Sequence, residues 1–401
     1  MKKPITFLSV FFLVVVLVVT GCTSGKKQTQ PQNPTVATTY GKISGVIDEG
    51  IYTFKGIPYA KAERFMAPQE PDAWDGVLEC TEFGPVARQV APWYPDSVQS
   101  EKDLFSANVW TQGIMDGKKR PVMVWLHGGG FHIGASNDPM TYGKAMAKKG
   151  DVVFVSINHR LNILGYLDLS ACGPNYAQSA NVGMLDIVKA LEWVNKNIDK
   201  FGGNPSDVTI LGESGGGGKV GTLMCMPAAK GLFRKAIIQS GTLINVMNKE
   251  SSQALGLAVL ENLGLTASDV EKLDTISYQT LVKAGNDAIA KISGPRKPGS
   301  PTMFGFAPSP DGVDLLQQPF SPGFAEISKD IPLMMGTTLN ELMQTVYGEK
   351  ELTLEQAKER LAKVYGESTD KYIELFAKAY PDYTPQDLLS IDNTFRTFTI
   401  L

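Results

Sequence analysis

Cysteine is scarce in this sequence. Four cysteines occur in 401 residues, namely Cys22, Cys80, Cys172 and Cys225. Cys22 lies at the end of an apolar leader, which leaves an odd number for the rest of the chain, so the sequence predicts no disulfide framework. The spacings of these cysteines also fit no zinc site. We expect Cys80, Cys172 and Cys225 to be small core residues or incidental thiols. We expect no metal or cofactor.

Excess positive charge is also lacking. The chain has 38 lysine and arginine residues against 41 acidic ones, a net charge of −3. A mildly acidic balance argues against nucleic acid as a partner. Histidine is rarer still, and the three histidines, His127, His132 and His159, all lie in the first half of the chain.

Only one long apolar run is present. It extends from Ile5 to Val19, follows Met1-Lys2-Lys3 and ends in Val19-Thr20-Gly21-Cys22. This pattern is typical of a signal peptide and resembles a bacterial lipoprotein signal, with cleavage before Cys22 and a diacylglycerol on its sulfur. A plain N-terminal membrane anchor is the alternative. Either interpretation predicts that the protein lies outside the cytoplasm and is anchored to a membrane of the cell envelope.

The composition then divides the chain into three parts. Residues 1–21 form the predicted signal peptide. Residues 22–39 are rich in Lys, Gln, Pro, Asn and Thr, a mixture that buries too little apolar surface to offset the entropy of ordering, so we expect a disordered tether. Residues 40–401 are long enough for one large α/β domain.

Continuous apolar runs in this domain predict strands that are buried on both faces. A segment with apolar residues at helical spacing, from Leu185 to Ile198, separates two of these strands, and a strand–helix–strand unit implies a right-handed parallel crossover. The fold class is therefore α/β, with a mostly parallel, doubly wound sheet. The predicted strands are Val122–Leu126, Val152–Ile157, Val208–Leu211, Ala236–Ile238 and Ile331–Met335.

Two further segments complete the outline. Residues 42–48 and 51–55, joined by Glu49-Gly50, predict a hairpin at one edge of the sheet. Residues 247–292 are helical in pattern, so we interpret the region of about 245–300 as a cap inserted between strands of the sheet.

The chemistry begins at Gly212-Glu213-Ser214-Gly215-Gly216, which directly follows the predicted strand Val208–Leu211. A nucleophilic serine on a sharp strand-to-helix turn needs this context, because glycines on both sides let the backbone close tightly. Ser214 is therefore the predicted nucleophile. A glycine-rich turn without catalytic function is the alternative.

A second glycine run, His127-Gly128-Gly129-Gly130-Phe131, follows the strand Val122–Leu126. Unhindered amides in such a loop can approach a developing oxyanion. The sequence thus predicts an oxyanion hole made by the N–H groups of Gly129, Gly130 and Gly215. A turn that needs glycine only for steric reasons remains the alternative.

With these motifs the chain resembles the type-B carboxylesterase family, which includes the cholinesterases and the bacterial p-nitrobenzyl esterases. The resemblance covers nearly everything after residue 40 and implies an α/β-hydrolase fold and a carboxylic ester as substrate. Further motifs that carry it are Phe54-Lys55-Gly56-Ile57-Pro58-Tyr59-Ala60, Asn108-Val109-Trp110, Asn158-His159-Arg160-Leu161, Phe201-Gly202-Gly203-Asn204-Pro205, Gly231-Leu232-Phe233 and Gln239-Ser240-Gly241.

The resemblance also implies roles for single residues. Glu341, in Gly336-Thr337-Thr338-Leu339-Asn340-Glu341, matches the family's triad acid, although by composition alone it would be a solvated carboxylate. Glu213 matches a buried glutamate that gives electrostatic support, and Phe304 falls where relatives place an acyl-pocket aromatic residue. Asp311-Gly312 matches a structural turn. Ala87 and Leu104 replace two cysteines that bridge each other in the family.

One part of the family's pattern is missing. The family order is serine, acid, histidine, yet no histidine follows Glu341 in this sequence. His132, on the oxyanion side, is a poor candidate for the base. We expect that the sequence is truncated or comes from a frameshifted gene. The last strand and helix would then also be missing, and the enzyme would be slow. A non-catalytic adhesion protein and a histidine supplied by a separate polypeptide are the alternatives. The ester and the oligomeric state stay open.

Overall fold

The structure is a computed structural model of the chain and describes residues 33–139, 142–241, 245–293, 305–338, 341 and 352–398. The predicted signal peptide, Cys22 and Phe304 lie outside these residues. Among the helices that the structure describes, none combines the length and the apolar character that crossing a bilayer requires.

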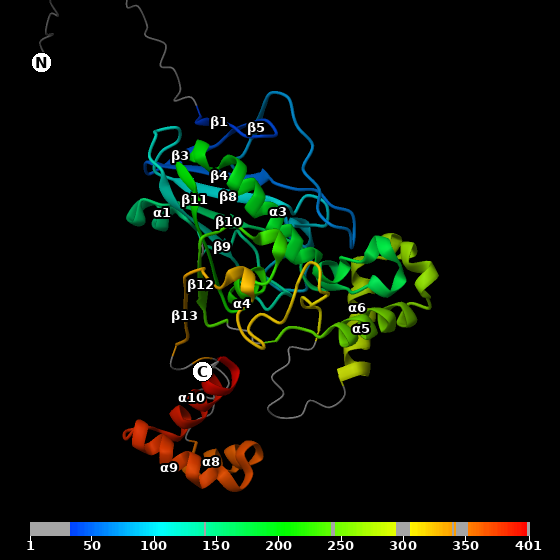
Figure 1. Cartoon of the computed structure of the whole chain (residues 1–401), viewed down its shortest axis with the longest axis vertical. Coiled ribbons are helices and arrows are strands. Elements are labelled where there is room, and N and C mark those ends of the chain that lie inside the picture. The colour runs from blue at the N-terminus through cyan, green and yellow to red at the C-terminus, as the bar shows by residue number, and fades with distance from the viewer. Residues whose placement is uncertain are drawn as a thin grey trace, which may run out of the picture. The chain divides into compact units, whose positions relative to one another are not determined.

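A mixed sheet forms the centre of the described chain, with the strand order β13-β12-β11-β9-β10-β8-β4-β3 (Figure 1). Strands β10, β9, β11, β12 and β13 are parallel to one another, whereas β8 pairs antiparallel with β10 and β4, and β4 pairs antiparallel with β3. The prediction of a mostly parallel sheet is confirmed. The strand bounds are β3 Val46–Asp48, β4 Ile51–Pro58, β8 Ser106–Thr111, β9 Arg120–Leu126, β10 Val153–Ile157, β11 Gly203–Glu213, β12 Lys235–Gln239 and β13 Leu333–Gly336.

The sheet interior explains why continuous apolar runs predicted these strands. Val122, Val124 and Leu126 of β9 are fully buried, as are Val153 and Val155 of β10. Burying each such side chain stabilises the fold by roughly 1.5–3 kcal/mol. The apolar composition of the central strands thus determines that they form the buried interior of the sheet. Strand β13, at the edge, differs, since its Met334 is 67% exposed.

Helices pack against the sheet, and they include the helix expected in the strand–helix–strand crossover (Figure 1). The helix predicted before β11 is α3, which packs against β11 and against α4. Its inward side chains, among them Leu191 and Trp193, are buried. The helices within and around the sheet are α1 Lys144–Gly150, α2 Asn162–Tyr166, α3 Val182–Asn197 and α4 Gly215–Leu223.

The N-terminal hairpin is confirmed in part. Strands β3 and β4 pair antiparallel across Glu49 and Gly50, both of which have positive φ. The predicted first strand, however, is broken at Gly45, where a Cβ would lie 2.4 Å from the carbonyl oxygen of Thr53. Residues before the break belong to a separate sheet with the order β1-β2-β5. Its strands are β1 Thr35–Ala37, β2 Lys42–Ser44 and β5 Val77–Glu79, and β6 Val86–Ala87 and β7 Gln99–Ser100 pair with each other.

The prediction of a disordered tether over residues 22–39 is wrong for residues 33–39. Val36 in β1 is 1% exposed, and β1 pairs with β2. The amide and the hydroxyl of Thr39 both donate to Oδ1 of Asn197, at 2.8 and 2.9 Å. These partners are distant in sequence, so local composition could not reveal them.

The segment between β12 and β13 is helical, as predicted. It contains α5 Lys249–Asn262, a 3-10 helix Ala267–Thr275 and α6 Tyr278–Ser293, and α5 and α6 lie side by side (Figure 1). The side chain of Asn248 caps α5 by accepting the amide of Ser251. After β13 the described chain forms helices with a small apolar core of their own, α8 Leu354–Tyr365, α9 Thr369–Ala379 and α10 Pro385–Phe398.

Candidate active site

Ser214 occupies the turn between β11 and α4. Its backbone has φ 54° and ψ −122°, and its amide donates to the carbonyl of Gln239 in the neighbouring strand β12 at 2.9 Å. A positive φ is rare for a residue with a side chain and costs on the order of 1–3 kcal/mol. The side chain is half-buried, and Oγ has no hydrogen-bond partner among the described residues. The strand–serine–helix turn expected from the sequence is therefore present.

The glycines around Ser214 are required by close packing. A Cβ on Gly212 would lie 2.4 Å from the carbonyl carbon of Gly216, and a Cβ on Gly216 would lie 2.0 Å from the carbonyl oxygen of Leu126. The start of α4 therefore rests directly on the end of β9. This contact brings the turn that holds Ser214 against the residues that follow β9.

The glycine run after β9 lies beside this turn. Gly129 and Gly130 have φ of 93° and 61°, and the Gly129 carbonyl accepts the amides of His132 and Ile133. Within the described chain, the amides of Gly129 and Gly130 donate to no backbone carbonyl. A Cβ on Gly215 would lie 2.3 Å from the amide nitrogen of Gly130. The structure thus brings together all three glycines predicted to form the oxyanion hole.

The carboxylates of Glu213 and Glu341 are close enough to interact electrostatically. Partial desolvation, and then the negative charge of Glu341, raise the pKa of Glu213. The Glu341 carboxylate accepts the amide of Thr338 at 2.9 Å. The expectation that Glu213 is buried is wrong, because its side chain is exposed. Glu213 is the last residue of β11, where the strand leaves the buried part of the sheet.

The three histidines lie on the side of the oxyanion loop. The rings of His127 and His159 are stacked, with centroids 4.8 Å apart and an interplanar angle of 11°. Burial holds the pKa of both well below the usual range, and the charge of Lys219 lowers it further. Burial also lowers the pKa of His132. None of them bonds to Ser214 in the described structure.

Sequence reasoning missed Lys219, which lies in α4 one turn after Ser214. The side chain is fully buried, and Nζ donates to the carbonyl oxygen of His127 at 2.7 Å. Burial lowers the pKa of Lys219 to about 7. A signal was present, since a lysine within the small, apolar run Gly215–Leu223 contradicts the pattern of a buried helix.

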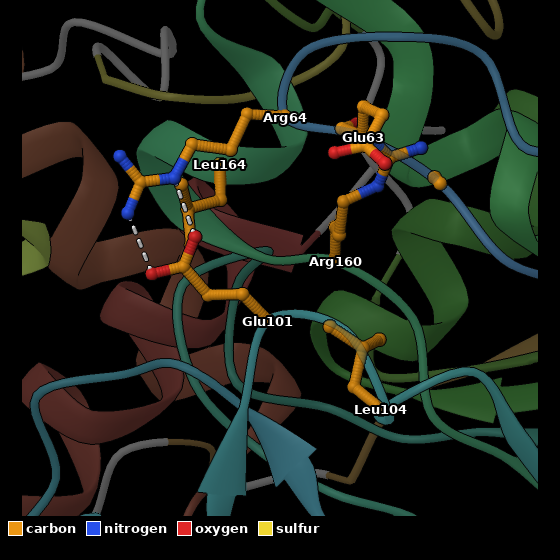
Figure 2. Close-up of a pocket in the computed structure, with 7 residues that line it drawn as sticks. Glu63, Arg64, Glu101, Leu104, Arg160 and Leu164 are labelled. Carbon is orange, nitrogen blue, oxygen red and sulfur yellow. Dashed lines mark hydrogen bonds and ion pairs between the residues drawn. The ribbon is translucent and has the colours of Figure 1, made fainter. Parts of the chain in front are cut away.

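Arg64 and Glu101 line a small cavity together with Leu104 (Figure 2). The guanidinium of Arg64 donates to both oxygens of Glu101, at 2.6 and 2.8 Å, and also to the carbonyls of Leu273 and Ile276 at 2.9 and 2.6 Å. This network ties the end of the 3-10 helix before α6 to the loops that follow β4 and β7.

The remaining predicted residues have structural surroundings. Ala87 and Leu104 are buried, consistent with apolar replacements of a disulfide. Cys80 and Cys225 are buried, and together with Cys172 they are unpaired in the described structure. Oδ1 of Asp311 accepts the amides of three following residues, Val313, Asp314 and Leu315, which closes a turn. The structural assignment of Asp311 is thus supported.

Comparison with known proteins gives matches over most of the chain. A sequence model of the carboxylesterase family matches residues 32–391. The para-nitrobenzyl esterase of Bacillus subtilis is 38% identical over 314 residues, which are 76% of this chain and 62% of that protein. The phenmedipham hydrolase of Pseudarthrobacter oxydans is 32% identical over 325 residues, 77% of this chain and 62% of that protein. The chain therefore spans less than two thirds of the length of these relatives.

Solved structures with the same fold also match. A carboxylesterase of Geobacillus stearothermophilus has a TM-score of 0.75 and 36% identity, and an esterase of Clostridium hathewayi, described as hydrolysing aliphatic aromatic polyesters, has a TM-score of 0.77 and 38% identity. Each match covers 91% of this chain and 74% of the other. The predicted α/β-hydrolase fold is confirmed.

Proposed function

This chain belongs to the carboxylesterase family, and we propose that the protein hydrolyses carboxylic esters through an acyl-enzyme on Ser214. The observation that carries this proposal is the strained backbone of Ser214, with φ 54°, beside the glycine amides. A fold gains nothing from such strain by itself, so its presence points to chemistry at this residue.

The proposed reaction has two steps. Oγ of Ser214 attacks the ester carbonyl carbon while its proton passes to a base, which then supplies it to the departing alcohol, and the amides of Gly129, Gly130 and Gly215 stabilise the negative oxygen of the tetrahedral intermediate. Collapse breaks the bond to the alcohol oxygen, which takes up a proton and departs. Water then attacks the acyl carbon, releases the acid and restores the serine hydroxyl.

Glu341 is the proposed acid of the triad, and its role would be to orient a base and stabilise that base when it is protonated. Glu213 is proposed to contribute negative potential at the same turn. We propose that the base is none of the three histidines of this sequence, because none of them bonds to Ser214 in the described structure and burial lowers the pKa of each, which makes it a weaker base.

The proposed substrate is a carboxylic ester of a small molecule. The relative named as a para-nitrobenzyl esterase supports this class. The helices α5 and α6, in the region of about 245–300, are the proposed cap. Arg64 supports that assignment, because it fixes the carbonyls of Leu273 and Ile276 to the body of the fold.

Labelling with a fluorophosphonate tests the nucleophile. We expect a single adduct, located by peptide mass spectrometry on Ser214, and no adduct in Ser214→Ala. Because no histidine of this sequence bonds to Ser214 in the described structure, and loss of the base costs on the order of a millionfold in turnover, labelling should be slow and should accelerate when imidazole is added as a substitute base. An adduct that persists in Ser214→Ala, or no adduct with imidazole present, would contradict the proposal.

The non-catalytic alternative, an adhesion protein of the same fold, is favoured by one observation. Oγ of Ser214 has no hydrogen-bond partner in the described part of the chain. The labelling experiment separates the two functions, since an adhesion protein places no demand on the reactivity of Ser214. Absence of labelling under both conditions would favour adhesion.

We also propose that the protein is anchored at a bacterial cell envelope membrane through a lipid on Cys22. The support is the sequence alone, a charged start and an apolar run that ends in Val19-Thr20-Gly21-Cys22. Cys22→Ala should abolish incorporation of labelled palmitate and stop cleavage before residue 22. Normal processing of Cys22→Ala would favour a different signal.

A further inference from the structure

Lys219 is buried without a compensating negative charge. Its side chain is fully enclosed, and its one hydrogen bond in the described structure goes to the carbonyl oxygen of His127 at 2.7 Å. No ion pair joins Lys219 to a carboxylate within the described residues. Burying an amine in this way is unfavourable, and an apolar residue of the same size would cost less. The fold itself therefore does not require Lys219.

The surroundings of the amine are apolar or neutral. The ring of Phe131 lies 5.8 Å from Nζ. The imidazoles of His127 and His159 are close enough for the charge of Lys219 to lower their pKa, and His132 is affected in the same way. Arg160, whose charge also acts on His159, is held by Asp186. Among these groups, the hydrogen-bond acceptor of Lys219 is a backbone carbonyl.

That carbonyl has a special place in the chain. His127 is the residue between β9 and the glycine run, and its carbonyl belongs to the peptide unit that leads into Gly128. A Cβ on Gly216 would lie 3.1 Å from the same oxygen, so the peptide is held between Lys219 and the start of α4. Three glycines in sequence have little conformational preference of their own. Their direction must be set by contacts at the ends of the run.

We propose that Lys219 is a positioning residue for the oxyanion loop, and that its hydrogen bond to the His127 carbonyl fixes the direction in which the amides of Gly129 and Gly130 point. This inference rests on the proposed function, because it assigns those amides to the oxyanion hole. Lys219 itself touches no reacting atom. It acts by holding one peptide group, and through it the donors that stabilise the intermediate.

Two substitutions separate this role from packing. Lys219→Met keeps the length of the side chain and removes the donor, whereas Lys219→Gln retains an N–H donor without charge. Val220→Ala, at a fully buried position on the same helix, is the packing control. The readouts are the rate of Ser214 phosphonylation with imidazole present, the unfolding temperature, and amide hydrogen exchange over residues 127–133.

Loss of one oxyanion donor lowers rates by about 100-fold to 1,000-fold in serine hydrolases. We expect Lys219→Met to slow phosphonylation by at least about 10-fold, to speed exchange in the loop and to keep or raise the unfolding temperature. Lys219→Gln should recover part of the rate. Val220→Ala should lower the unfolding temperature and leave the rate of the folded protein unchanged.

The outcomes are distinguishable. If wild-type protein is phosphonylated and Lys219→Met reacts equally fast, the positioning role is wrong while the proposed function stands. If Lys219→Gln is no faster than Lys219→Met, donation to the carbonyl is not the cause. If wild-type protein does not react at all, the proposed function fails, and unchanged exchange over residues 127–133 in Lys219→Met would then also reject the positioning role.

Discussion

The carbonyl oxygen of Leu126 occupies the space in which a Cβ of Gly216 would lie, 2.0 Å from that position. This single contact joins the end of β9 to the start of α4. The two glycine runs, far apart in the sequence, are adjacent in the fold because β11 pairs with β9, with Gly212 opposite Leu126, and this contact sets how closely α4 approaches β9. Any side chain at residue 216 must push the two elements apart.

Gly216→Ala should therefore destabilise the protein by about 2–3 kcal/mol, as overpacking of a rigid contact does. The neighbour is backbone and cannot move away cheaply. Urea denaturation measures the effect. Gly323→Ala is the matched control, because a Cβ there meets nothing within 4 Å and the φ of Gly323 is not positive. Equal stability of the two variants would show that the contact between β9 and α4 yields easily.

Strain at Ser214 predicts a gain in stability on substitution by glycine. Both serine and alanine are unfavourable at φ 54°, whereas glycine is not. Relief of strain, less the entropy that glycine adds to the unfolded chain, should make Ser214→Gly more stable than Ser214→Ala by about 1 kcal/mol. Denaturation curves of the two variants, neither of which has the nucleophile, give this difference. A less stable glycine variant would mean that the turn is relaxed.

The central fold was predictable because buried parallel strands record their environment in their own sequence. Strand β10 is buried at every position from Val153 to Ile157, where a half-exposed strand would alternate between buried and exposed residues. The turn that holds Ser214 and the oxyanion loop were predictable for a related reason, since only glycine fits where the backbones of these two segments meet. The family match confirms the resemblance inferred from these motifs.

Features that depend on distant partners were not predictable. Thr39 is ordered because Asn197, 158 residues away, accepts its hydrogen bonds, and Val36 is buried in a core that residues from the whole fold build. Exposure of Glu213 follows from its place at the end of β11, which the family pattern does not encode. Lys219 was overlooked because its partner is a carbonyl 92 residues away, and no side-chain pattern marks a backbone acceptor. The predicted pocket residue Phe304 lies outside the described residues.

The buried amine of Lys219 predicts a specific pH dependence of stability. Its pKa is lowered to about 7 in the folded protein from 10.5 in the unfolded chain. Between these values the unfolded chain binds a proton that the folded protein does not, so stability rises with pH by up to about 1.4 kcal/mol per unit. Below pH 7 both states are protonated and this contribution is flat.

Lys219→Met removes that dependence. Relative to wild type, the variant should be most stabilised near pH 6, and the difference should shrink steadily towards pH 10. Urea unfolding at pH 6, 7.5 and 9 measures it. Lys230→Met, at an exposed position, controls for the general effect of removing a lysine. A difference between Lys219→Met and wild type that stays constant with pH would mean that the amine titrates normally.

Arg160 and Asp186 form an ion pair next to the stacked histidines that is enclosed on all sides, with side-chain exposures of 4% and 0%. Oδ2 of Asp186 accepts both Nε and the backbone amide of Arg160, at 2.8 and 3.0 Å, and Oδ1 accepts a terminal guanidinium nitrogen at 2.6 Å. Both oxygens of the Asp186 carboxylate therefore accept hydrogen bonds from Arg160. Asparagine has the same shape but turns an N–H₂ group toward a cation.

Asp186→Asn should therefore destabilise the protein by about 3–5 kcal/mol, because it leaves a buried guanidinium without its counter-charge. Asp72→Asn is the control, since Asp72 pairs with Lys61 at the surface and both side chains are exposed. That substitution should change stability by less than about 1 kcal/mol. Denaturation of both variants at one pH decides between the two sites. If Asp186→Asn destabilises the protein no more than Asp72→Asn does, water reaches the guanidinium of Arg160. The interior around His159 would then be more hydrated than its burial implies.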